Sequence, residues 1–281
     1  RLAFQRFHNQ YVKATLIESV SPGAGGKKYI GELLDLSAGR GGDLPKWKYA
    51  KLKRIIGIDI DKAGIRYAMS FYKAYPKPKP NVYYVWGDSS KLIFPNYDAG
   101  LDDMSKLRLQ EYISNKYSFD IVSIQFSLHY FFDDEQRIRN VLQNVSDNLK
   151  VGGHFIGTCF DGERVFEALK KNKTIDGKYG DEILWSITKK YRIRTFKLSK
   201  PNLGQRIEVY VKSIGNPHEE FLVNFSYLEK LCKEYNLELV KISSFKELYD
   251  QMMQLNNKKF ELPDYEKEFS FLNSSFKFVK K

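Results

Sequence analysis

The stretch "LLDLSAGRGGDLPKW", residues 33–47, decides the fold of this chain. It begins as an apolar strand, passes through a turn with three glycines, and then presents Asp43, Lys46 and Trp47. In open parallel sheets, a glycine-rich turn between a strand and a helix lies at the carboxyl edge, where nucleotide cofactors bind. The dinucleotide-binding pattern would place a glycine at position 37, but Ser37 stands there. The turn therefore predicts a nucleotide-like ligand and leaves its identity open.

Strand-like runs alternate with helical patterns on both sides of this turn. Apolar residues at helical spacing occupy roughly residues 2–20, 61–75 and 135–149. Near-continuous apolar runs are typical of strands that are buried on both faces of a parallel sheet. The alternation predicts an α/β fold with a doubly wound, mostly parallel sheet and right-handed crossovers. The predicted strands are residues 31–36, 54–60, 81–88, 119–130 and 153–160.

The pattern changes after about residue 160. Residues 186–199 and 205–214 are predicted to be antiparallel strands joined by the turn "KPNLGQ". A helix and a further strand are predicted within residues 226–242. Residues 95–116 are polar and poorly periodic, and we interpret them as an insertion between strands.

We expect a single domain over residues 1–281. In this interpretation residues 1–20 place a helix over the site, residues 29–160 form the cofactor-binding core, and residues 161–281 complete the sheet and a substrate pocket. The sequence begins at Arg1, without methionine and without a signal-like apolar segment. We therefore expect this domain to be excised from a longer chain.

Composition and charge favour a polyanionic partner. The chain has 281 residues and a formal charge of +12, from 46 lysines and arginines against 34 aspartates and glutamates. With 19 tyrosines and 20 phenylalanines available for stacking, RNA or a nucleotide fits this balance, although a solvated basic surface would also produce it.

The cysteine content bears on the compartment and on metals. Only Cys159 and Cys232 occur, so we expect no disulfide framework, no metal site and a reducing, intracellular compartment. The sequence has no apolar run of the roughly 18 residues that a membrane span needs, and we expect no membrane partner.

Two further predicted strands end in an acidic residue. Asp59 follows Gly39 by 20 residues, where a carboxylate can accept hydrogen bonds from both ribose hydroxyls, and Asp88 is placed to accept from the amine of adenine. Several acidic residues at this entrance would repel a pyrophosphate, whereas the sulfonium cation of S-adenosylmethionine tolerates them. We therefore predict S-adenosylmethionine as the cofactor. Each aspartate alone also fits a helix cap or a turn, and Asp43 has the position of an N-cap before a Leu-Pro helix start.

Five segments together resemble the messenger-RNA cap guanine-N7 methyltransferases over nearly the whole chain. In the order of that family's motifs they are "RFHNQYVKATLI" (6–17), "LLDLSAGRGGDLPKW" (33–47), "FDIVSIQFSLHYFF" (119–132), "LKVGGHFIGT" (149–158) and "EEFLVNFSYLEKLCKEYNLELV" (219–240). Within this family, we expect a methyltransferase domain of the kind found in large-DNA-virus capping enzymes. It implies the class I S-adenosylmethionine-dependent methyltransferase fold, with the antiparallel strands as a carboxy-terminal addition.

The resemblance also implies roles for individual residues. Cofactor contacts are expected at Lys13, Ser37, Gly39, Asp59, Asp88, Ser89, Gln125 and Tyr130. Cap contacts are expected at Asn9, Arg40, Lys46, His129 and Glu220. The sequence departs from the family at three places: Ser37 replaces a glycine, Gln10 replaces an asparagine, and the carboxy-terminal aromatic on the cap base has Phe271 or Asn273 as its candidate.

The implied reaction is methyl transfer to a nitrogen that carries no proton. N7 of guanine has a free lone pair at neutral pH, so we assign no obligatory acid or base and expect His129, Tyr130 and Glu220 to act by positioning. Glu220 can accept from the N1 and N2 donors of guanine, which would select guanine over adenine. His129 and Tyr130 are predicted at a strand end, with their side chains on opposite faces.

Two other functions stay open on the sequence alone. The chain can be an S-adenosylmethionine-dependent methyltransferase for another RNA base or a small molecule, or a non-catalytic module that binds RNA or stimulates a partner. The expected partner is the 5′ end of capped mRNA, with other capping activities fused to or associated with the domain. The expected location is a cytoplasmic viral factory or virion for a viral chain, and the nucleus for a cellular one.

Overall fold

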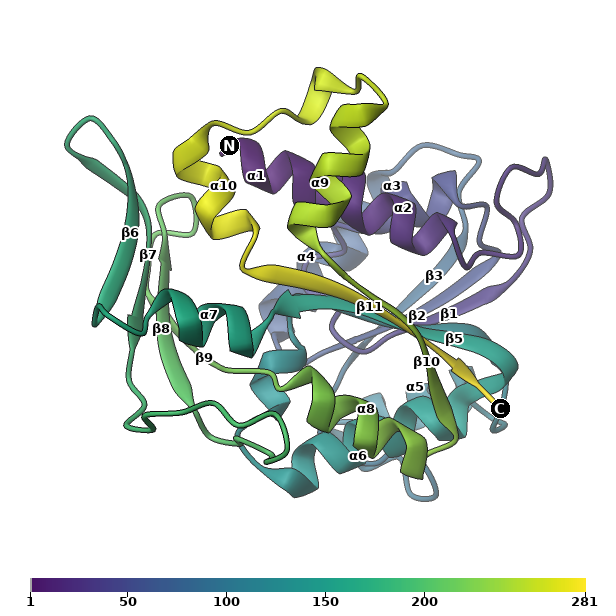
Figure 1. Cartoon of the computed structure of the whole chain (residues 1–281). Helices are drawn as coiled ribbons and strands as arrows, with labels where there is room; N and C mark the ends of the chain where they lie inside the picture. The colour runs from purple at the N-terminus through teal and green to yellow at the C-terminus, as the bar shows by residue number, and fades with distance from the viewer. Residues whose placement is uncertain (1) are drawn as a thin grey trace.

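Seven strands form the central sheet of the computed structural model, which describes residues 2–281 (Figure 1). The order across the sheet is β10-β11-β5-β4-β1-β2-β3. β11 is antiparallel to both of its neighbours, and the pairs β5–β4, β4–β1, β1–β2 and β2–β3 are parallel. The predicted doubly wound, mostly parallel α/β fold is therefore confirmed. The strands are β1 (Glu32–Asp35), β2 (Arg54–Asp59), β3 (Asn81–Trp86), β4 (Phe119–Gln125), β5 (Leu149–Phe160), β10 (Leu237–Ser244) and β11 (Asn273–Lys280).

Helices cover both faces of this sheet (Figure 1). Neighbouring residues of a strand point to opposite faces, so Leu33 packs in one apolar cluster with Trp47, whereas Leu34 packs in another with Ile138. Because both faces are buried, the strands are apolar throughout. One face carries α2 (Lys13–Glu18), α3 (Leu44–Tyr49) and α4 (Lys62–Ala74), and the other carries α5 (Asp103–Tyr112), α6 (Glu135–Asn148) and α8 (Phe225–Glu234).

The amino-terminal segment forms one helix in three parts, α1 (Ala3–Arg6), the π-helical stretch η1 (Phe7–Val12) and α2. The predicted helix at 1–20 is thus present, and Arg1 lies outside the described residues. Phe4 contacts Phe269 with 4.6 Å between ring centroids, and Phe7 contacts Tyr249 at 5.5 Å. These contacts hold the helix beside α9 (Phe245–Gln254) and α10 (Asp264–Ser270), which follow one another through the short 3₁₀ helix η3 (Lys258–Phe260) (Figure 1).

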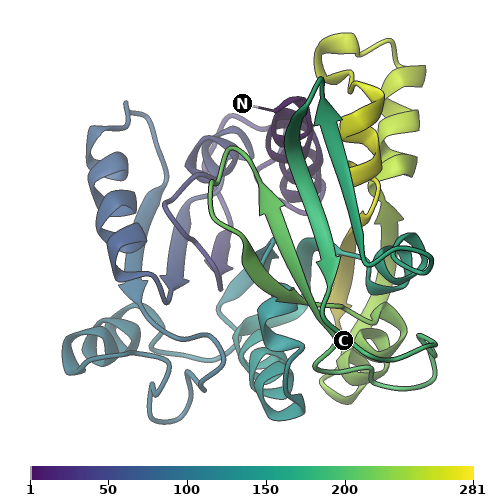
Figure 2. The same ribbon diagram turned by 90° about the vertical axis from the view of Figure 1, so that its left-hand side faces the viewer.

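Four antiparallel strands form a second, separate sheet (Figure 2). They are β6 (Thr174–Tyr179), β7 (Glu182–Lys189), β8 (Arg206–Val211) and β9 (His218–Phe221), in chain order. β7 and β8 are the predicted antiparallel pair, but both end earlier than predicted. The prediction that residues 190–199 continue the strand is wrong. Tyr191 and Phe196 pack on Phe166 of α7 (Gly162–Ala168), which draws this segment away from the sheet.

The predicted strand 119–130 is also too long. β4 ends at Gln125, because Phe126 adopts a positive φ of 54° that no extended strand has. Leu128–Phe131 then form a 3₁₀ helix, η2. The interval 95–116 contains the helix α5, which begins where the Asp102 side chain accepts a hydrogen bond from the backbone N–H of Ser105.

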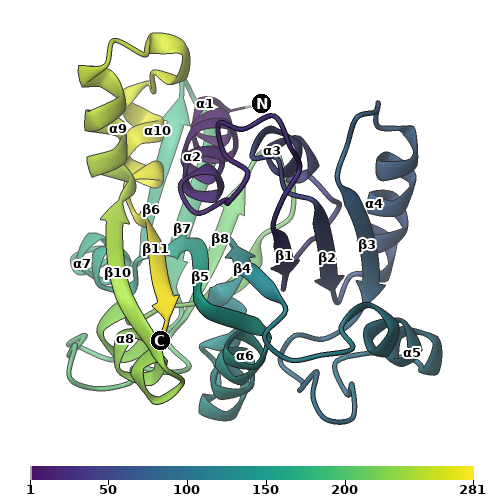
Figure 3. The ribbon, with the colours of Figure 1, turned by 90° about the vertical axis from the view of Figure 1, so that its right-hand side faces the viewer.

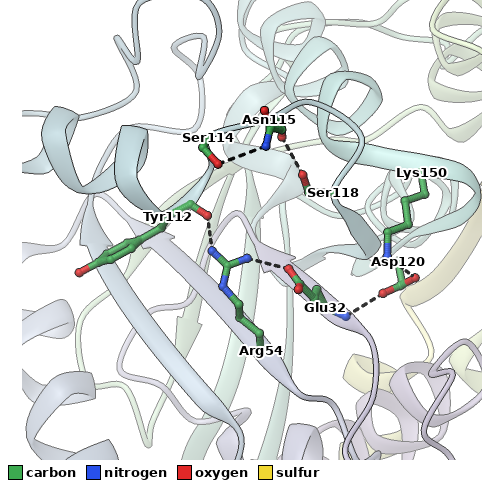
Figure 4. Close-up of polar contacts among 8 residues, drawn as sticks. All are labelled: Glu32, Arg54, Tyr112, Ser114, Asn115, Ser118, Asp120 and Lys150. Atoms are coloured by element: carbon green, nitrogen blue, oxygen red, sulfur yellow. Dashed lines mark hydrogen bonds and ion pairs between the residues drawn. The ribbon is translucent and has the colours of Figure 1, made fainter.

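Polar contacts tie the amino ends of four strands together (Figure 4). The Arg54 guanidinium of β2 donates to the Glu32 carboxylate of β1 at 2.6 Å and to the Tyr112 carbonyl at the end of α5. The Asp120 carboxylate of β4 accepts from the Glu32 backbone N–H at 2.8 Å and from the Lys150 ammonium of β5 at 2.9 Å. The amino edge of the sheet is therefore closed by its own side chains, and the carboxyl edge is left for a ligand.

Both cysteines lie buried in one apolar cluster as free thiols. Burial raises the pKa of Cys159 and of Cys232, so both stay protonated and serve as packing groups. Within residues 2–281, no helix has the length and the apolarity needed to cross a membrane.

The position of β11 in the core generates a stability prediction. Phe276 is 1% exposed and contacts Phe155 at 5.1 Å between ring centroids. Phe276→Ala should lower the free energy of unfolding by about 3–5 kcal/mol, measured by urea denaturation, because it leaves a cavity between β11 and β5. Lys277→Ala, on the opposite face of the same strand, should change it by less than about 0.5 kcal/mol. Equal effects of the two substitutions would contradict this placement of β11.

Candidate active site

A cavity of about 380 Å³ opens at the carboxyl ends of β1, β2 and β3. Five predicted cofactor-binding residues line it, namely Ser37, Asp59, Asp88, Ser89 and Tyr130. The tips of three strands thus converge on one crevice, as their parallel order requires. The other lining residues are Leu36, Ile60, Gly87, Ser127, Phe131, Arg137 and Phe221.

The glycine turn is fixed to the tip of β2 by hydrogen bonds. The Asp59 carboxylate accepts from the backbone N–H of Gly39 at 2.7 Å and from that of Asp61 at 2.8 Å. Gly39 and Gly41 both have positive φ, and a Cβ at Gly41 would lie 2.8 Å from the Tyr84 hydroxyl. The turn therefore needs glycine at 41 for both its conformation and its space. The carboxylate that was predicted for the ribose also holds the shape of the turn.

Ser37 occupies the family's glycine position without backbone strain. It is not one of the described residues with positive φ, and its N–H donates to Asp35 at 3.1 Å. Within the described part of the chain, its buried hydroxyl has no hydrogen-bond partner, and the residue lines the 380 Å³ cavity. The side chain therefore offers a polar atom to a ligand in this cavity.

Asp43 forms a buried ionic cluster with two lysines. Its Oδ1 lies 2.8 Å from the Lys13 ammonium and 2.9 Å from the Lys46 ammonium. Burial opposes ionisation of this carboxyl, but the two cations outweigh burial and lower its pKa to about 2. Asp43 has the predicted N-cap position of α3, but its side chain makes no capping hydrogen bond. Its carboxylate instead joins the amino-terminal helix to α3.

Three predicted contacts lie outside the 380 Å³ cavity. Gln125 is buried between β4 and β5, where it donates to Ser123 and accepts from Thr158, both at 3.0 Å. Lys13 forms an ion pair with Asp43, which directly follows the glycine turn. Gly39 lies in the turn itself and has its N–H bonded to Asp59.

A second cavity, of about 290 Å³, lies between the amino-terminal helix, η2, α10 and the second sheet. The predicted cap contacts Asn9, His129 and Glu220 line it, together with Asn273. Phe271, the other carboxy-terminal candidate, packs on Tyr249 instead, with 5.4 Å between ring centroids. The remaining lining residues are Phe4, Gln5, His8, Phe126, Tyr130, Phe160, Val209, Val211, Ile214, His218 and Phe269.

Glu220 is the buried acid of this second cavity. Its Oε1 lies 2.8 Å from Nε2 of His218, and its Oε2 lies 3.5 Å from Nδ1 of His129. The hydrogen bond to Glu220 raises the pKa of His218, whereas burial lowers the pKa of His129. Nε2 of His129 is buried and has no hydrogen-bond partner among the residues described. His129 and Glu220 therefore line this cavity with polar atoms that a ligand could contact.

Tyr130 belongs to the wall of both cavities. His129 and Tyr130 were predicted on opposite faces of a strand end, and this is wrong. Both lie in η2, their ring centroids are 4.2 Å apart, and both line the second cavity, because a 3₁₀ turn does not alternate its side chains as a strand does. Burial raises the pKa of the Tyr130 phenol to about 12, so it remains a neutral donor. The Tyr130 side chain thus lines both cavities.

Arg40 and Lys46 line neither cavity. The Arg40 guanidinium lies over the ring of Tyr67 on α4, 4.2 Å from its centroid. The Lys46 ammonium contacts Asp43 and donates to the Gly42 carbonyl at 3.1 Å. Both residues lie at the glycine turn, so the structure does not bring them together with Asn9 and Glu220.

His218 was missed in the sequence, although a signal for it exists. It precedes Glu220 by two residues in β9, and residues at that spacing share a face of a strand. Arg137 of α6 and Phe221 of β9 carry no local signal, because their contact with the cofactor-side cavity arises only when distant elements pack.

Comparison with solved structures identifies the class of protein. An S-adenosylmethionine-dependent methyltransferase from Clostridium acetobutylicum matches with a TM-score of 0.58 and 15% identity, covering 99% of this chain and 97% of that one. At such identity the likeness concerns the fold alone. The chain has the fold of the S-adenosylmethionine-dependent methyltransferases.

Sequence comparison narrows this class to one family. The family described as mRNA (guanine-N(7))-methyltransferase domain matches residues 1–268, and the chain belongs to it. mRNA cap guanine-N(7) methyltransferase 1 of Oryza sativa subsp. japonica is 32% identical over 251 residues, which cover 88% of this chain and 62% of the rice protein. A probable mRNA-capping enzyme of Acanthamoeba polyphaga mimivirus is 31% identical over 269 residues, 88% of this chain and 22% of that protein. The chain spans about half the length of the curated relatives it matches.

Asp35 gives this site a dependence of stability on pH. Burial, together with the nearby Asp43, raises the pKa of this carboxyl to about 8. In the unfolded chain the group ionises near pH 4, so between about pH 4 and pH 8 the folded state binds more protons and becomes less stable as the pH rises.

Asp35→Asn removes the titrating proton but keeps an oxygen that can accept from Ser37. The variant should therefore gain stability relative to the wild type as the pH rises from 5 to 8, by more than about 1 kcal/mol. Urea denaturation at several pH values measures this difference. A difference that stays constant across this range would show that Asp35 ionises normally.

Proposed function

We propose that this domain transfers the methyl group of S-adenosylmethionine to N7 of the guanosine cap of mRNA. The observation that carries the proposal is the placement of Tyr130 between two cavities of different chemistry. One cavity lies at the strand tips and is lined by two aspartates. In the other cavity, a buried glutamate contacts two histidines. A methyl donor and a purine acceptor bound on either side of one side chain would be neighbours, as direct transfer requires.

The first cavity fits the cofactor by the chemistry of its donors and acceptors. Asp59 can accept from ribose hydroxyls, Asp88 can accept from an adenine amine, and the free hydroxyl of Ser37 can bind the polar methionine end. Ser89 is held by its hydroxyl, which donates to the Leu36 carbonyl at 2.7 Å. When bound, S-adenosylmethionine supplies an electrophilic methyl group on a sulfonium.

The second cavity fits guanine. The Glu220 carboxylate can accept from the N1 and N2 donors, a pair that adenine lacks, so it would select guanine. His218 holds one oxygen of that carboxylate, which fixes its orientation. Asn9 and Asn273 add polar side chains to the wall of this cavity. We propose that Arg40, Lys46 and Lys13 contribute positive charge near the glycine turn and do not contact the ligand inside the cavity.

The residues of the site would act by positioning. N7 carries no proton, so no side chain needs to remove one during attack on the methyl group. Tyr130 and His129 would hold the base against the cofactor, and the surrounding apolar side chains, such as Phe4 and Phe126, would exclude water.

The partner and the location follow from the same proposal. We propose capped mRNA as substrate, and other capping activities as covalent or associated neighbours, because the chain matches only part of a capping enzyme of mimivirus. Such a domain would act inside the cell, in a cytoplasmic viral factory or virion for a viral chain and in the nucleus for a cellular one.

Methyl transfer to the dinucleotide GpppA tests the proposed reaction. The wild-type domain should produce 7-methylguanosine, located by mass spectrometry after nuclease digestion. Glu220→Gln should lower kcat/KM by about 10- to 100-fold, because one of two acceptors for the guanine donors is lost. Glu219→Gln, an exposed neighbour paired with Arg206, is the matched control and should stay within about 2-fold. Methylation of another atom, or equal activity in both variants, would reject this assignment.

Binding of S-adenosylhomocysteine tests the cofactor cavity separately from the reaction. At 100 times its Kd the ligand should stabilise the wild type by about 2.7 kcal/mol, seen as a rise in melting temperature. Asp59→Ala should abolish this rise, whereas Asp61→Asn, which keeps a helix cap and lies outside the cavity, should retain it. A wild-type domain without any rise would instead be a non-catalytic module.

A further inference from the structure

An aromatic stripe runs along one side of α4, with its last two rings partly buried against the core and its first ring open to solvent. It consists of Tyr67, Phe71 and Tyr75, which lie on one side of the helix because they are four residues apart. The Tyr67 and Phe71 rings are stacked with 6.4 Å between centroids, and the Phe71 and Tyr75 rings meet edge to face at 5.5 Å. Tyr67 is 50% exposed. Figure 3 shows α4 beside β3 at one edge of the sheet, far from α9 and α10.

Cations flank the stripe at both ends. The Arg40 guanidinium lies 4.2 Å from the centroid of Tyr67, and the Lys48 ammonium lies 5.4 Å from that of Tyr75. Beyond Tyr75 the same arrangement continues, with Lys51 over Tyr29 at 5.0 Å. A row of rings with cations beside it offers stacking faces and positive charge together.

The surroundings of the stripe are basic. Residues 62–87 contain five lysines and arginines and no aspartate or glutamate, and residues 44–58 contain another five with none. Among the acidic residues of neighbouring elements, Glu18 at the end of α2 lines the adjoining cavity, Asp61 caps the start of α4, and Asp102 lies 3.9 Å from Lys62. The segments that supply α3 and α4 are therefore strongly basic.

The stripe leads from the active site to a groove. It begins at Arg40 in the glycine turn and runs about 12 Å along α4, the rise of eight helical residues. It ends at a cavity of about 480 Å³ that Lys48, Tyr49, Lys51 and Tyr75 line, with Tyr49 67% exposed.

We propose that this face binds the single-stranded RNA that follows the cap, an inference that rests on the proposed function for the position of the cap. Bases stack on aromatic side chains whatever their sequence, and the lysines and arginines neutralise the phosphates. Rings placed beside cations can stack with bases while the cations contact phosphates, so the arrangement favours RNA over an acidic protein. The surface extends the substrate site from the cap to the transcript.

The test measures binding of an uncapped, fluorescently labelled 12-nucleotide RNA by anisotropy. Tyr67→Ala combined with Lys48→Ala should weaken binding by at least about 5-fold and flatten the salt dependence by about 0.7 log units per log salt for the lost phosphate contact. Tyr67→Phe, which keeps the ring, should bind like the wild type. Lys230→Ala combined with Lys233→Ala on α8 removes two positive charges elsewhere, one more than the test variant, and should leave RNA binding unchanged.

Methylation distinguishes this inference from the proposed function. The Tyr67 and Lys48 double variant should keep wild-type activity on GpppA and show a raised KM for capped RNA. Wild-type RNA affinity in that variant would overturn the inference. Poly-glutamate serves as a control ligand that has charge but no bases. The inference would also be overturned if the double variant lost RNA and poly-glutamate binding equally while Tyr67→Ala alone had no effect. Failure of the wild type to methylate GpppA would reject the proposed function and leave the anisotropy result interpretable.

Discussion

The site depends on one constraint, the parallel order of β4, β1, β2 and β3. Parallel neighbours end at the same edge of a sheet, so residues that are far apart in sequence meet there. The hydrogen bond from the Gly39 N–H to the Asp59 carboxylate then sets how the tips of β1 and β2 are spaced. The ion pairs among Glu32, Arg54, Asp120 and Lys150 close the opposite edge (Figure 4), which leaves the carboxyl edge to the ligand.

A second interaction joins the two halves of the site. The Lys13–Asp43–Lys46 cluster holds the amino-terminal helix against the turn that bounds the cofactor-side cavity. The same helix carries His8 and Asn9 into the wall of the second cavity. Because the same helix contacts the glycine turn and lines the second cavity, it positions one cavity relative to the other. Tyr130 lines both cavities. Positioning alone can then align a donor and an acceptor.

Much of the fold could be predicted because its signals are local. The strands from β1 to β5 were recognisable as mostly apolar runs, since burial on both faces leaves them few polar positions. The end of β4 could not be predicted, because a positive φ at Phe126 has no signature in a phenylalanine. The loop after Lys189 alternates like a strand, but contacts with Phe166 in another element draw its aromatic residues away.

The candidate site divides in the same way. Ser37, Asp59, Asp88 and Ser89 could be placed from the sequence, because strand tips fix their position. The role of Asp43 could not, because its partner Lys13 comes from a helix 30 residues earlier and replaces the expected cap. Residues of the second sheet reach the site only through tertiary packing, and His218 could be found only once Glu220 was known to lie in a strand.

A crystal structure with S-adenosylhomocysteine and GpppA bound together tests the central claim most directly. The account predicts adenosine against Asp59 and Asp88, guanine against Glu220, and the sulfur facing N7 past Tyr130. Cofactor and guanine bound on the same side of Tyr130, or either one outside these two cavities, would contradict it.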